Sequence, residues 1–242
     1  MLTSIRPPLA ALALLIVVFA VACGGSDEAA QPTIPADVGA VRSAAATAMA
    51  QIDTARFSIE RGGAVVHVDE GDTLGFERAE GRYAAPSSAE ALVTVIVAGL
   101  TAEIGAIAID GTTWITNPAT GRWEAAPEGL SFDPASLFKP NFGWTALLTD
   151  GLQQAELLEP APDADDRYHL RGVADAGPIS TLTSGLVDES VPVDLWIDAT
   201  SGYVVEARFD AGTGDDVSSW RLTLSDYGAP VEIEPPELSS ES

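Results

Sequence analysis

The hydrophobic residues recur with two different periods along the chain. From Asp37 to Ile52 they recur at three- and four-residue steps, which predicts an amphipathic helix with Asp37 as its N-cap. After Ala55, apolar and polar residues alternate in short runs rich in β-branched side chains, which is typical of strands with one buried face. The alternation predicts strands at residues 55–60, 65–68, 91–99, 103–109, 112–116 and 122–125, and strands or a bent hairpin at 74–78 and 81–84.

The middle of the chain returns to helical spacing. Asp133 and Pro134 predict the start of a helix, because proline is favoured at the first helical position, and Pro140 ends it. A second helix is predicted over residues 143–152, with Trp144, Leu147, Leu148 and Leu152 on one face. Further on, the pattern predicts a helix at 176–186 with Ile179, Leu182 and Leu186 facing inward, and strands at 154–159, 167–173, 191–198, 203–210, 218–225 and 231–233.

These elements predict an α+β fold. Asp110-Gly111 is a strong signal for a tight hairpin between residues 103–109 and 112–116. In the run 191–198, apolar residues at 193, 195 and 197 share one face of a strand, as in antiparallel sheets with one polar face. Because helices are inserted in blocks between many strands, we expect one large curved antiparallel sheet with helices packed on its concave face.

The N-terminus carries an export signal. Residues 9–22 are fourteen uncharged residues that follow Arg6, fewer than the about 20 of a membrane-spanning helix. They end in Ala20-Val21-Ala22-Cys23, which resembles the lipobox of bacterial lipoproteins, although leucine is more usual where Ala20 stands. We expect cleavage before Cys23 and lipid attachment to its sulfur. The alternative is an ordinary secreted protein with a chance cysteine at the cleavage site.

This interpretation divides the chain into a signal peptide (1–22), a lipid-anchored flexible linker (23–36), a folded domain (37–234) and a disordered tail (235–242). Cys23 is the single cysteine, so no internal disulfide can form, and acylation accounts for the leftover thiol. More than one acyl chain on that cysteine is enough for stable anchoring. The predicted location is the extracytoplasmic face of the cell membrane.

The charge excludes one class of partner. The formal net charge is −24, and all 36 acidic residues follow Cys23. Nucleic-acid binding needs a basic footprint, so no nucleic-acid partner is expected. Attraction to anionic lipid surfaces also needs Lys and Arg, so the folded domain should stand off the membrane on its linker.

The sequence offers no catalytic constellation. His67 and His169 stand a hundred residues apart and show no metal-ligand spacing. No G-x-S-x-G, P-loop or G-x-G-x-x-G motif occurs. The acidic clusters at 69–72, 163–166 and 214–216 are interpreted as solvated turns, with weak cation sites as the alternative. We therefore assign no catalytic residue, metal or cofactor, and we expect a protein that is not an enzyme.

The order of several short segments resembles the LppX/LprAFG family of actinobacterial lipid-binding lipoproteins, and within it most of all LprG. The likeness extends from Asp37 to Glu237. It departs at Lys139, where the family usually has asparagine, in the longer acidic segment 157–166, and in 177–187. The matching segments are Val93-Thr94-Val95, Ile109-Asp110-Gly111 with Trp114, Phe132-Asp133-Pro134-Ala135, Leu147-Leu148, Val191-Pro192-Val193, Trp196-Ile197 and Leu222-Thr223-Leu224-Ser225.

The resemblance implies a half-barrel in which the sheet and helices enclose a large apolar cavity for acyl chains. Val93 matches the point where the cavity wall of the family narrows. The alternative is that the apolar residues are plain core, since every α+β domain has such a stripe. The implied lining residues are Val93, Val95, Val97, Ile107 and Ile109 on the sheet and Leu147, Leu148, Leu152, Leu182 and Leu186 on the helices.

The leading hypothesis is therefore a lipoprotein that binds a multi-acylated lipid or glycolipid and carries it across the cell envelope. A membrane lipid transporter is an implied partner, and a monomer is expected. The second hypothesis is an envelope scaffold lipoprotein with a filled core, which would need an exposed apolar patch. The third is an extracytoplasmic hydrolase with scattered carboxylates, which would need a strongly perturbed acid in a cleft.

Overall fold

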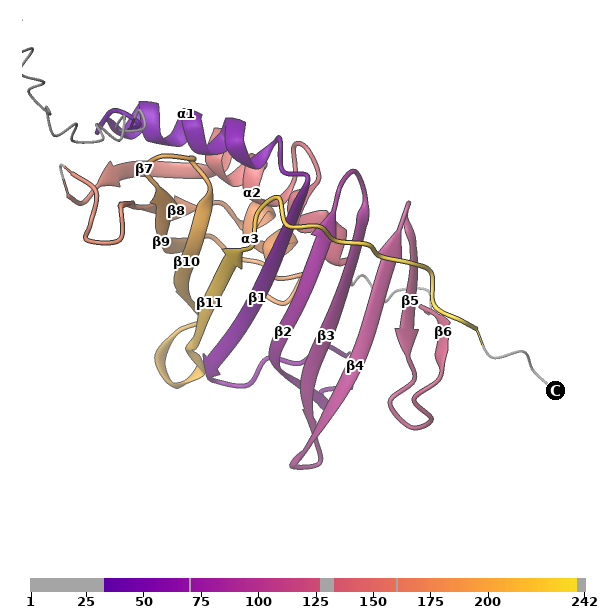
Figure 1. Ribbon diagram of the computed structural model, residues 1–242. Coiled ribbons are helices and arrows are strands. Elements are labelled where there is room, and N and C mark those ends of the chain that lie inside the picture. Colours follow the sequence, from indigo (N-terminus) through magenta and orange to yellow (C-terminus); the bar gives the residue numbers. More distant parts are fainter. Residues whose placement is uncertain (1–32, 70, 127–132, 160, 239–242) are drawn as a thin grey trace, which may run out of the picture. The chain divides into compact units, whose positions relative to one another are not determined.

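The computed structural model describes residues 33–69, 71–126, 133–159 and 161–238 (Figure 1). The described residues form one compact unit. The predicted signal peptide and residues 23–32 of the predicted linker, Cys23 among them, lie outside the described residues, so those predictions stay predictions.

A single antiparallel sheet of eleven strands dominates the fold. Its strand order is β6-β5-β4-β3-β2-β1-β11-β10-β9-β8-β7. Neighbouring strands are consecutive in sequence except at the centre, where β1 pairs with β11. In the described residues β6 and β7 are the two edges of an open sheet. The strands are β1 (Thr54–Gly63), β2 (Leu74–Ala84), β3 (Ser88–Val97), β4 (Leu100–Ile109), β5 (Thr112–Thr116), β6 (Trp123–Ala125), β7 (Leu152–Leu157), β8 (Arg167–Ala174), β9 (Val191–Asp198), β10 (Val204–Ala211) and β11 (Ser218–Ser225).

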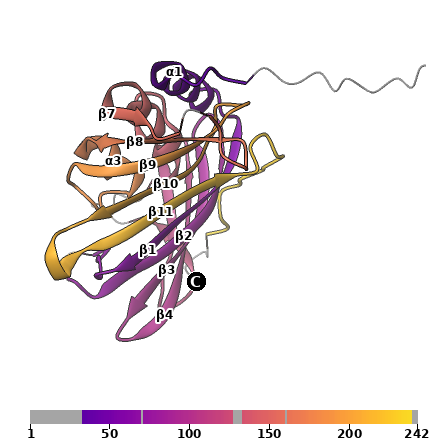
Figure 2. The same cartoon turned by 90° about the vertical axis from the view of Figure 1, so that its left-hand side faces the viewer.

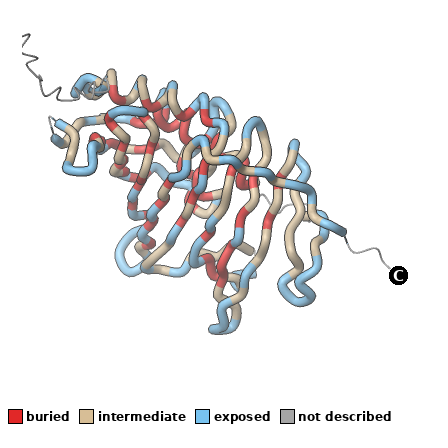
Figure 3. The backbone as a smooth tube through the Cα atoms, in the orientation of Figure 1, coloured by how far each residue is buried: buried red, intermediate tan, exposed pale blue. Residues whose placement is uncertain are grey.

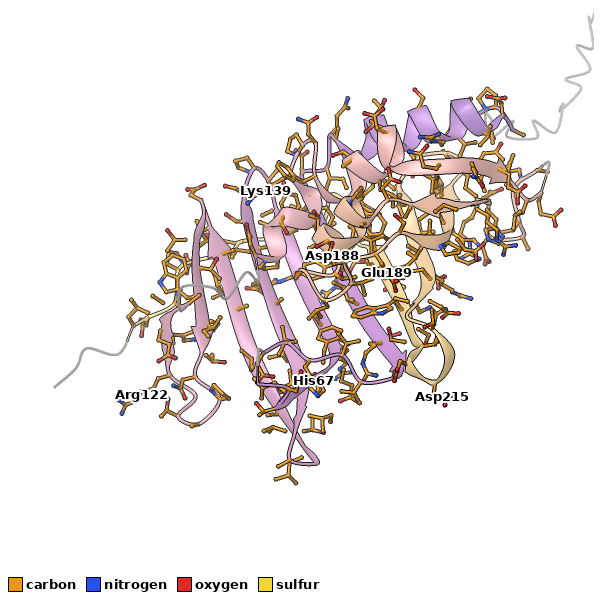
Figure 4. The ribbon with its side chains drawn as sticks, turned by 180° about the vertical axis from the view of Figure 1, so that it is seen from behind. His67, Arg122, Lys139, Asp188, Glu189 and Asp215 are labelled. Atoms are coloured by element: carbon orange, nitrogen blue, oxygen red, sulfur yellow. The ribbon has the colours of Figure 1, made fainter. Side chains whose placement is uncertain are left out.

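The helices gather on one face of this sheet (Figures 2 and 4). As predicted, the Asp37 carboxylate caps the first helix, where it accepts a hydrogen bond from the Ala40 amide at 2.9 Å. The 3₁₀ helix η1 contacts β2, β3 and β4, α2 and α3 contact η1 and each other, and α1 contacts α2 and η2. The helical elements are α1 (Val38–Met49), the 3₁₀ helices η1 (Pro134–Phe138) and η3 (Gly214–Asp216), α2 (Gly143–Ala146), the π-helical turn η2 (Leu147–Gly151) and α3 (Ala176–Leu182).

Alternation along the strands separates an apolar face from a polar one (Figure 3). In β9, Val193, Leu195 and Ile197 are buried, whereas Asp194 and Trp196 between them are half-buried. We call the face that packs against the helices the concave face and the other one the outer face. The prediction of one large antiparallel sheet with helices on one face is confirmed.

Several predicted elements differ in detail. Residues 65–68 form a single bridge, between His67 and Gly75, instead of a strand. The two runs predicted at 74–78 and 81–84 are one strand, β2, whose ladder shifts register between Phe76 and Arg78. Residues 231–233 are not a strand, because this segment pairs with no other one in the described part of the chain.

The helical predictions also change in length. The helix predicted at 143–152 is one α-helical turn followed by the π-helical turn, and Leu152 already belongs to β7. The helix predicted at 176–186 ends at Leu182. It stops there because the Thr183 hydroxyl accepts a hydrogen bond from the Val187 amide at 3.1 Å and Ser184 adopts a left-handed conformation with φ of 54°.

Candidate functional site

The strand register places the predicted sheet residues on two different faces. Val93 lies opposite Ala79 of β2 and Ile104 of β4. Val95 lies opposite Phe76 and Ala102. Both valines are buried on the concave face and belong to the core that also contains the helical residues.

Val97 keeps the same face by alternation but lies at the end of β3. It is half-buried, and its partner Leu100 is 71% exposed. Val97 therefore lies at the border of the concave surface, not within it.

Ile107 and Ile109 do not continue the surface of Val93, which corrects the expectation from the sequence. In the β3–β4 ladder Ile107 lies opposite Glu90 and Ile109 opposite Ser88, so both isoleucines point to the outer face. The cause is the turn at Ala98-Gly99, which has positive φ angles of 50° and 78° and pairs Val97 with Leu100. This register turns the even-numbered residues of β4 toward the concave face, with Leu100 at its border. The others are Ala102, Ile104, Ala106 and Ala108.

The predicted helical residues meet the sheet residues in one core. Leu147, Leu148 and Leu152 are almost completely buried, as is Leu182. All four share a hydrophobic cluster with Val93 and Val95. Leu186, beyond the end of α3, is half-buried and packs against that cluster. The structure thus brings together every predicted helical residue, although Leu152 comes from a strand.

Aromatic stacking holds η1 on the concave face. The Phe138 ring stacks on Tyr83 of β2 with a centroid distance of 4.4 Å, and its centroid is 6.1 Å from that of Phe57 of β1. Burial raises the pKa of Tyr83, and the charge of Asp53 adds to the effect. These contacts fix the distance between η1 and the sheet.

Lys139, the departure from the family pattern, has a local structural role. Its Nζ atom lies 2.5 Å from Oδ2 of Asp133. Oδ1 of the same carboxylate accepts a hydrogen bond from the Ala135 amide at 3.0 Å, as an N-cap does. Lys139, at the C-terminal end of η1, therefore forms an ion pair with the same Asp133 side chain that caps the N-terminal end.

A groove opens beside the core between residues 64–68 and the segment after α3. Its volume is about 280 Å³, and its apolar lining comes from Val66, Leu186 and Val187. Its floor reaches Ala211 and Ser218, which are buried on the concave face. The acidic side chains that line it are those of Asp188, Glu189 and Asp216, and Figure 4 shows the first two in front of the strands.

Hydrogen bonds hold both sides of this groove in place. Glu189 Oε1 accepts from the Gly212 amide at 2.6 Å and ties the segment after α3 to the β10–β11 turn. The Arg61 guanidinium donates to the carbonyl oxygens of Phe76 at 2.6 Å and Ala64 at 2.7 Å, which ties residues 62–68 to β2. The position of both sides of the groove is therefore fixed by hydrogen bonds to the sheet and its turns. The sequence did not indicate it, because its two sides are far apart along the chain.

The outer face carries the paired charges. The carboxylate of Glu206 lies 2.5 Å from both Arg208 Nε and Arg221 Nε. Burial alone would raise the pKa of Glu206, but the hydrogen bonds from the two arginines outweigh it and lower the pKa. His169 stacks on Trp196 and lies 2.7 Å from Asp194 on the same face. These groups satisfy one another and do not reach the concave face.

Within the ranges that the structure describes, no group of three or more His, Cys, Asp or Glu residues could hold a metal ion. No helix there is long and apolar enough to cross a membrane.

Comparison with known proteins identifies the family. The model of the LppX_LprAFG lipoprotein family matches residues 42–233. LprF from Mycobacterium bovis is 18% identical with a TM-score of 0.62, covering 85% of this chain and 99% of its own. LppX from Mycobacterium tuberculosis is 19% identical with a TM-score of 0.55, covering 81% and 98%. At these identities the two structures show a shared fold, and a comparison with curated proteins gives no significant match. Because the family model spans well over half of the sequence, the chain belongs to the LppX_LprAFG lipoprotein family.

Proposed function

We propose that this protein binds an acylated lipid or glycolipid between the sheet and the helices and carries it across the cell envelope. In this proposal it is anchored through Cys23 to the extracytoplasmic face of the cell membrane. The linker lets the folded domain reach away from the membrane surface, and a membrane lipid transporter supplies or accepts the lipid. The protein acts as a monomer and performs no covalent chemistry.

The observation that carries the proposal is the uneven size of side chains on the concave face. On β8–β11 this face carries large residues, among them Leu170, Leu195, Phe209 and Trp220. On β3 and β4, inside the border pair Val97 and Leu100, this face carries eight residues that are mostly small, and Ile104 is the single large one among them. Small side chains facing helices leave volume that acyl chains would fill. The eight are Ala89, Ala91, Val93, Val95, Ala102, Ile104, Ala106 and Ala108.

Burial of acyl chains supplies the binding energy. Each CH₂ group removed from water contributes about 0.8 kcal/mol, so a single long chain is enough for tight binding without a specific polar contact. The apolar surface between β3, β4 and the helices is therefore sufficient in chemical character for a lipid carrier.

The groove between residues 64–68 and the segment after α3 is the entrance in this proposal. Its apolar lining is continuous with the core through Val66 and Leu186. Its rim carries Asp188, Glu189 and Asp216, which would repel a negatively charged headgroup. The rim therefore favours sugars or other uncharged polar headgroups, which carboxylates can hydrogen-bond.

The test is to identify what the protein carries. Residues 24–242 contain the whole described fold and should be expressed in a lipid-containing host, purified without detergent and extracted with organic solvent. Mass spectrometry should find a multi-acylated lipid at near-stoichiometric amount, and light scattering should find a monomer. Purified protein that contains no lipid and takes up none from vesicles would contradict the proposal.

The competing function is an envelope scaffold with a filled core. It is favoured by the large side chains buried in the helical layer, among them Trp144, Leu137 and Leu147. A lipid-free protein in the same experiment, with the fold intact by circular dichroism, is the result that this function predicts.

A further inference from the structure

Two buried hydrogen-bonding groups in the helical layer have no protein partner. Among the described residues, Trp144 Nε1 and Ser184 Oγ are the buried side-chain atoms without one. Trp144 belongs to α2, Ser184 is the second residue after α3, and α2 contacts α3. Buried polar groups are almost always paired, because leaving one unpaired costs the desolvation of that group. Both atoms therefore indicate a polar partner that the described residues do not supply, and for the indole N–H that partner is an acceptor.

A second tryptophan shows that this fold pairs its buried indoles when the acceptor is protein. Trp220 of β11 is as buried as Trp144, with exposed fractions of 2% and 1%. Trp220 Nε1 donates to Ser218 Oγ at 2.9 Å. The contrast singles out Trp144 as the exception, in the layer that covers the proposed lipid site.

The surroundings of Trp144 restrict the acceptor. The indole lies in the same hydrophobic cluster as Val93 and Leu147, and α2 contacts η1, which packs on β2, β3 and β4. An indole N–H donates and does not accept, so its partner must be an acceptor oxygen. A free charge would be expensive in such a place, whereas an uncharged carbonyl is tolerated once it is hydrogen-bonded.

Resting on the proposed function, we propose that Trp144 Nε1 donates to the ester carbonyl oxygen of the bound lipid. The ester carbonyl joins acyl chain and headgroup, so it is the acceptor that enters an apolar site together with the chain. The protein then selects ester-linked lipids over ether-linked lipids of the same length, because an ether lipid has no carbonyl there. The ligand class is thereby narrowed to acyl esters.

The experiment compares two lipids that differ only in this group. Residues 24–242 are incubated with vesicles that contain equal amounts of digalactosyl dipalmitoylglycerol and its dihexadecyl ether analogue, and the bound lipids are counted by mass spectrometry. We expect the ester lipid to bind about ten-fold more than the ether lipid, because one buried hydrogen bond usually changes a binding constant by about this factor. Trp144→Phe keeps the ring but removes the donor, and it should reduce the preference to near one.

Trp220→Phe is the matched control. It also removes a buried indole donor, but one that already has a protein partner, so its ester preference should equal that of the unchanged protein. In case Trp144→Phe does not fold, the Trp144 indole N–H resonance of the unchanged protein gives a second readout. It should shift downfield on loading with the ester lipid and stay in place with the ether lipid.

The outcomes separate this inference from the proposed function. Equal binding of both lipids, or an ester preference that survives in Trp144→Phe, overturns the inference and leaves lipid binding intact; a bridging water would then be the partner of Trp144. Binding of neither lipid overturns the proposed function, and the inference with it.

Discussion

Val93 and Ile107 lie on adjacent strands of one sheet and point to opposite faces. Val93 lies opposite Ile104 on the concave face, whereas Ile107 lies opposite Glu90 on the outer face. The two residues therefore form a pair of positions in which the same substitution should have different effects.

Val93→Trp should block lipid uptake, because an indole at this point fills the space in front of the small residues of β3 and β4. Ile107→Trp should leave uptake unchanged, since its side chain is half-buried on the outer face. Both effects are measured by mass spectrometry of extracted lipid, with urea unfolding as a check of the fold. If Val93 belonged to a solid core, Val93→Trp would destabilise the protein by about 1–3 kcal/mol or more. Normal lipid content with normal stability in Val93→Trp would contradict both interpretations.

Cys23→Ser should abolish membrane anchoring without affecting the fold, since position 23 precedes the compact unit, which begins at residue 32. Labelling with radioactive palmitate should be lost, and the protein should move from the membrane fraction to the soluble one. Ser26→Ala is the control and should remain labelled. Continued labelling of Cys23→Ser would show that the lipid is attached elsewhere or that the chain is not a lipoprotein at this cysteine.

Glu206→Gln should lower the free energy of unfolding at pH 7 by about 1–3 kcal/mol, since it removes a carboxylate that two arginines hydrogen-bond. The folded-state pKa of Glu206 lies below its ordinary value of 4.5. This group therefore contributes its full stability above pH 4.5 and loses it as the pH falls through the lowered value. Urea unfolding from pH 7 to pH 3 should show the variant and the unchanged protein converging at the acidic end.

The control for this substitution is Glu80→Gln. Glu80 lies on the same face but is exposed, with Arg78 at 3.5 Å, so its replacement should change stability by less than about 0.5 kcal/mol. An equal loss in both variants would mean that overall charge, and not the buried pair, sets the effect.

Gly81→Ala should destabilise the protein by about 1–3 kcal/mol through overpacking. A Cβ atom at this position would lie 2.2 Å from the carbonyl oxygen of Glu90 and 2.3 Å from Cζ of Phe57. Gly177→Ala is the matched control, because nothing lies within 4 Å of its Cβ position and α3 should gain about 0.5–1 kcal/mol from alanine. Thermal unfolding of both variants would measure the difference, and equal stability would place the Phe57 ring elsewhere.

The fold class could be predicted because alternation and helical spacing are local properties of the sequence. In the runs 191–198 and 218–225, apolar residues recur at every second position, from Val191 and from Trp220 onward, and the structure buries these residues. Alternation does not tell whether a partner strand is present, which is why residues 65–68 and 231–233 look like strands and are not. It also does not tell which face a run presents, since that depends on turns.

The candidate site shows the same limit. The helical residues Leu147, Leu148 and Leu182 were predicted correctly as inward-facing, because one apolar stripe defines the inner side of a helix. The inward face of β4 was assigned wrongly, because the run 91–99 hides the turn at Ala98-Gly99. Counting from that two-residue turn would have paired Val93 with Ile104. The unpaired indole of Trp144 leaves no trace in the sequence at all.

The pairing of β1 with β11 at the centre of the sheet has a consequence for how the protein is made. In the proposed export, the N-terminal part of the folded domain leaves the membrane first, so β1–β6 emerge before β11, the strand that pairs with β1. Until β11 follows, the exposed edge of β1 is the point where the chain can pair with another copy. Because β11 lies between β1 and β10, loss of the C-terminal segment would separate β1–β6 from β7–β10 and would not simply remove an edge strand. The integrity of β11 therefore decides whether the two halves join into one sheet.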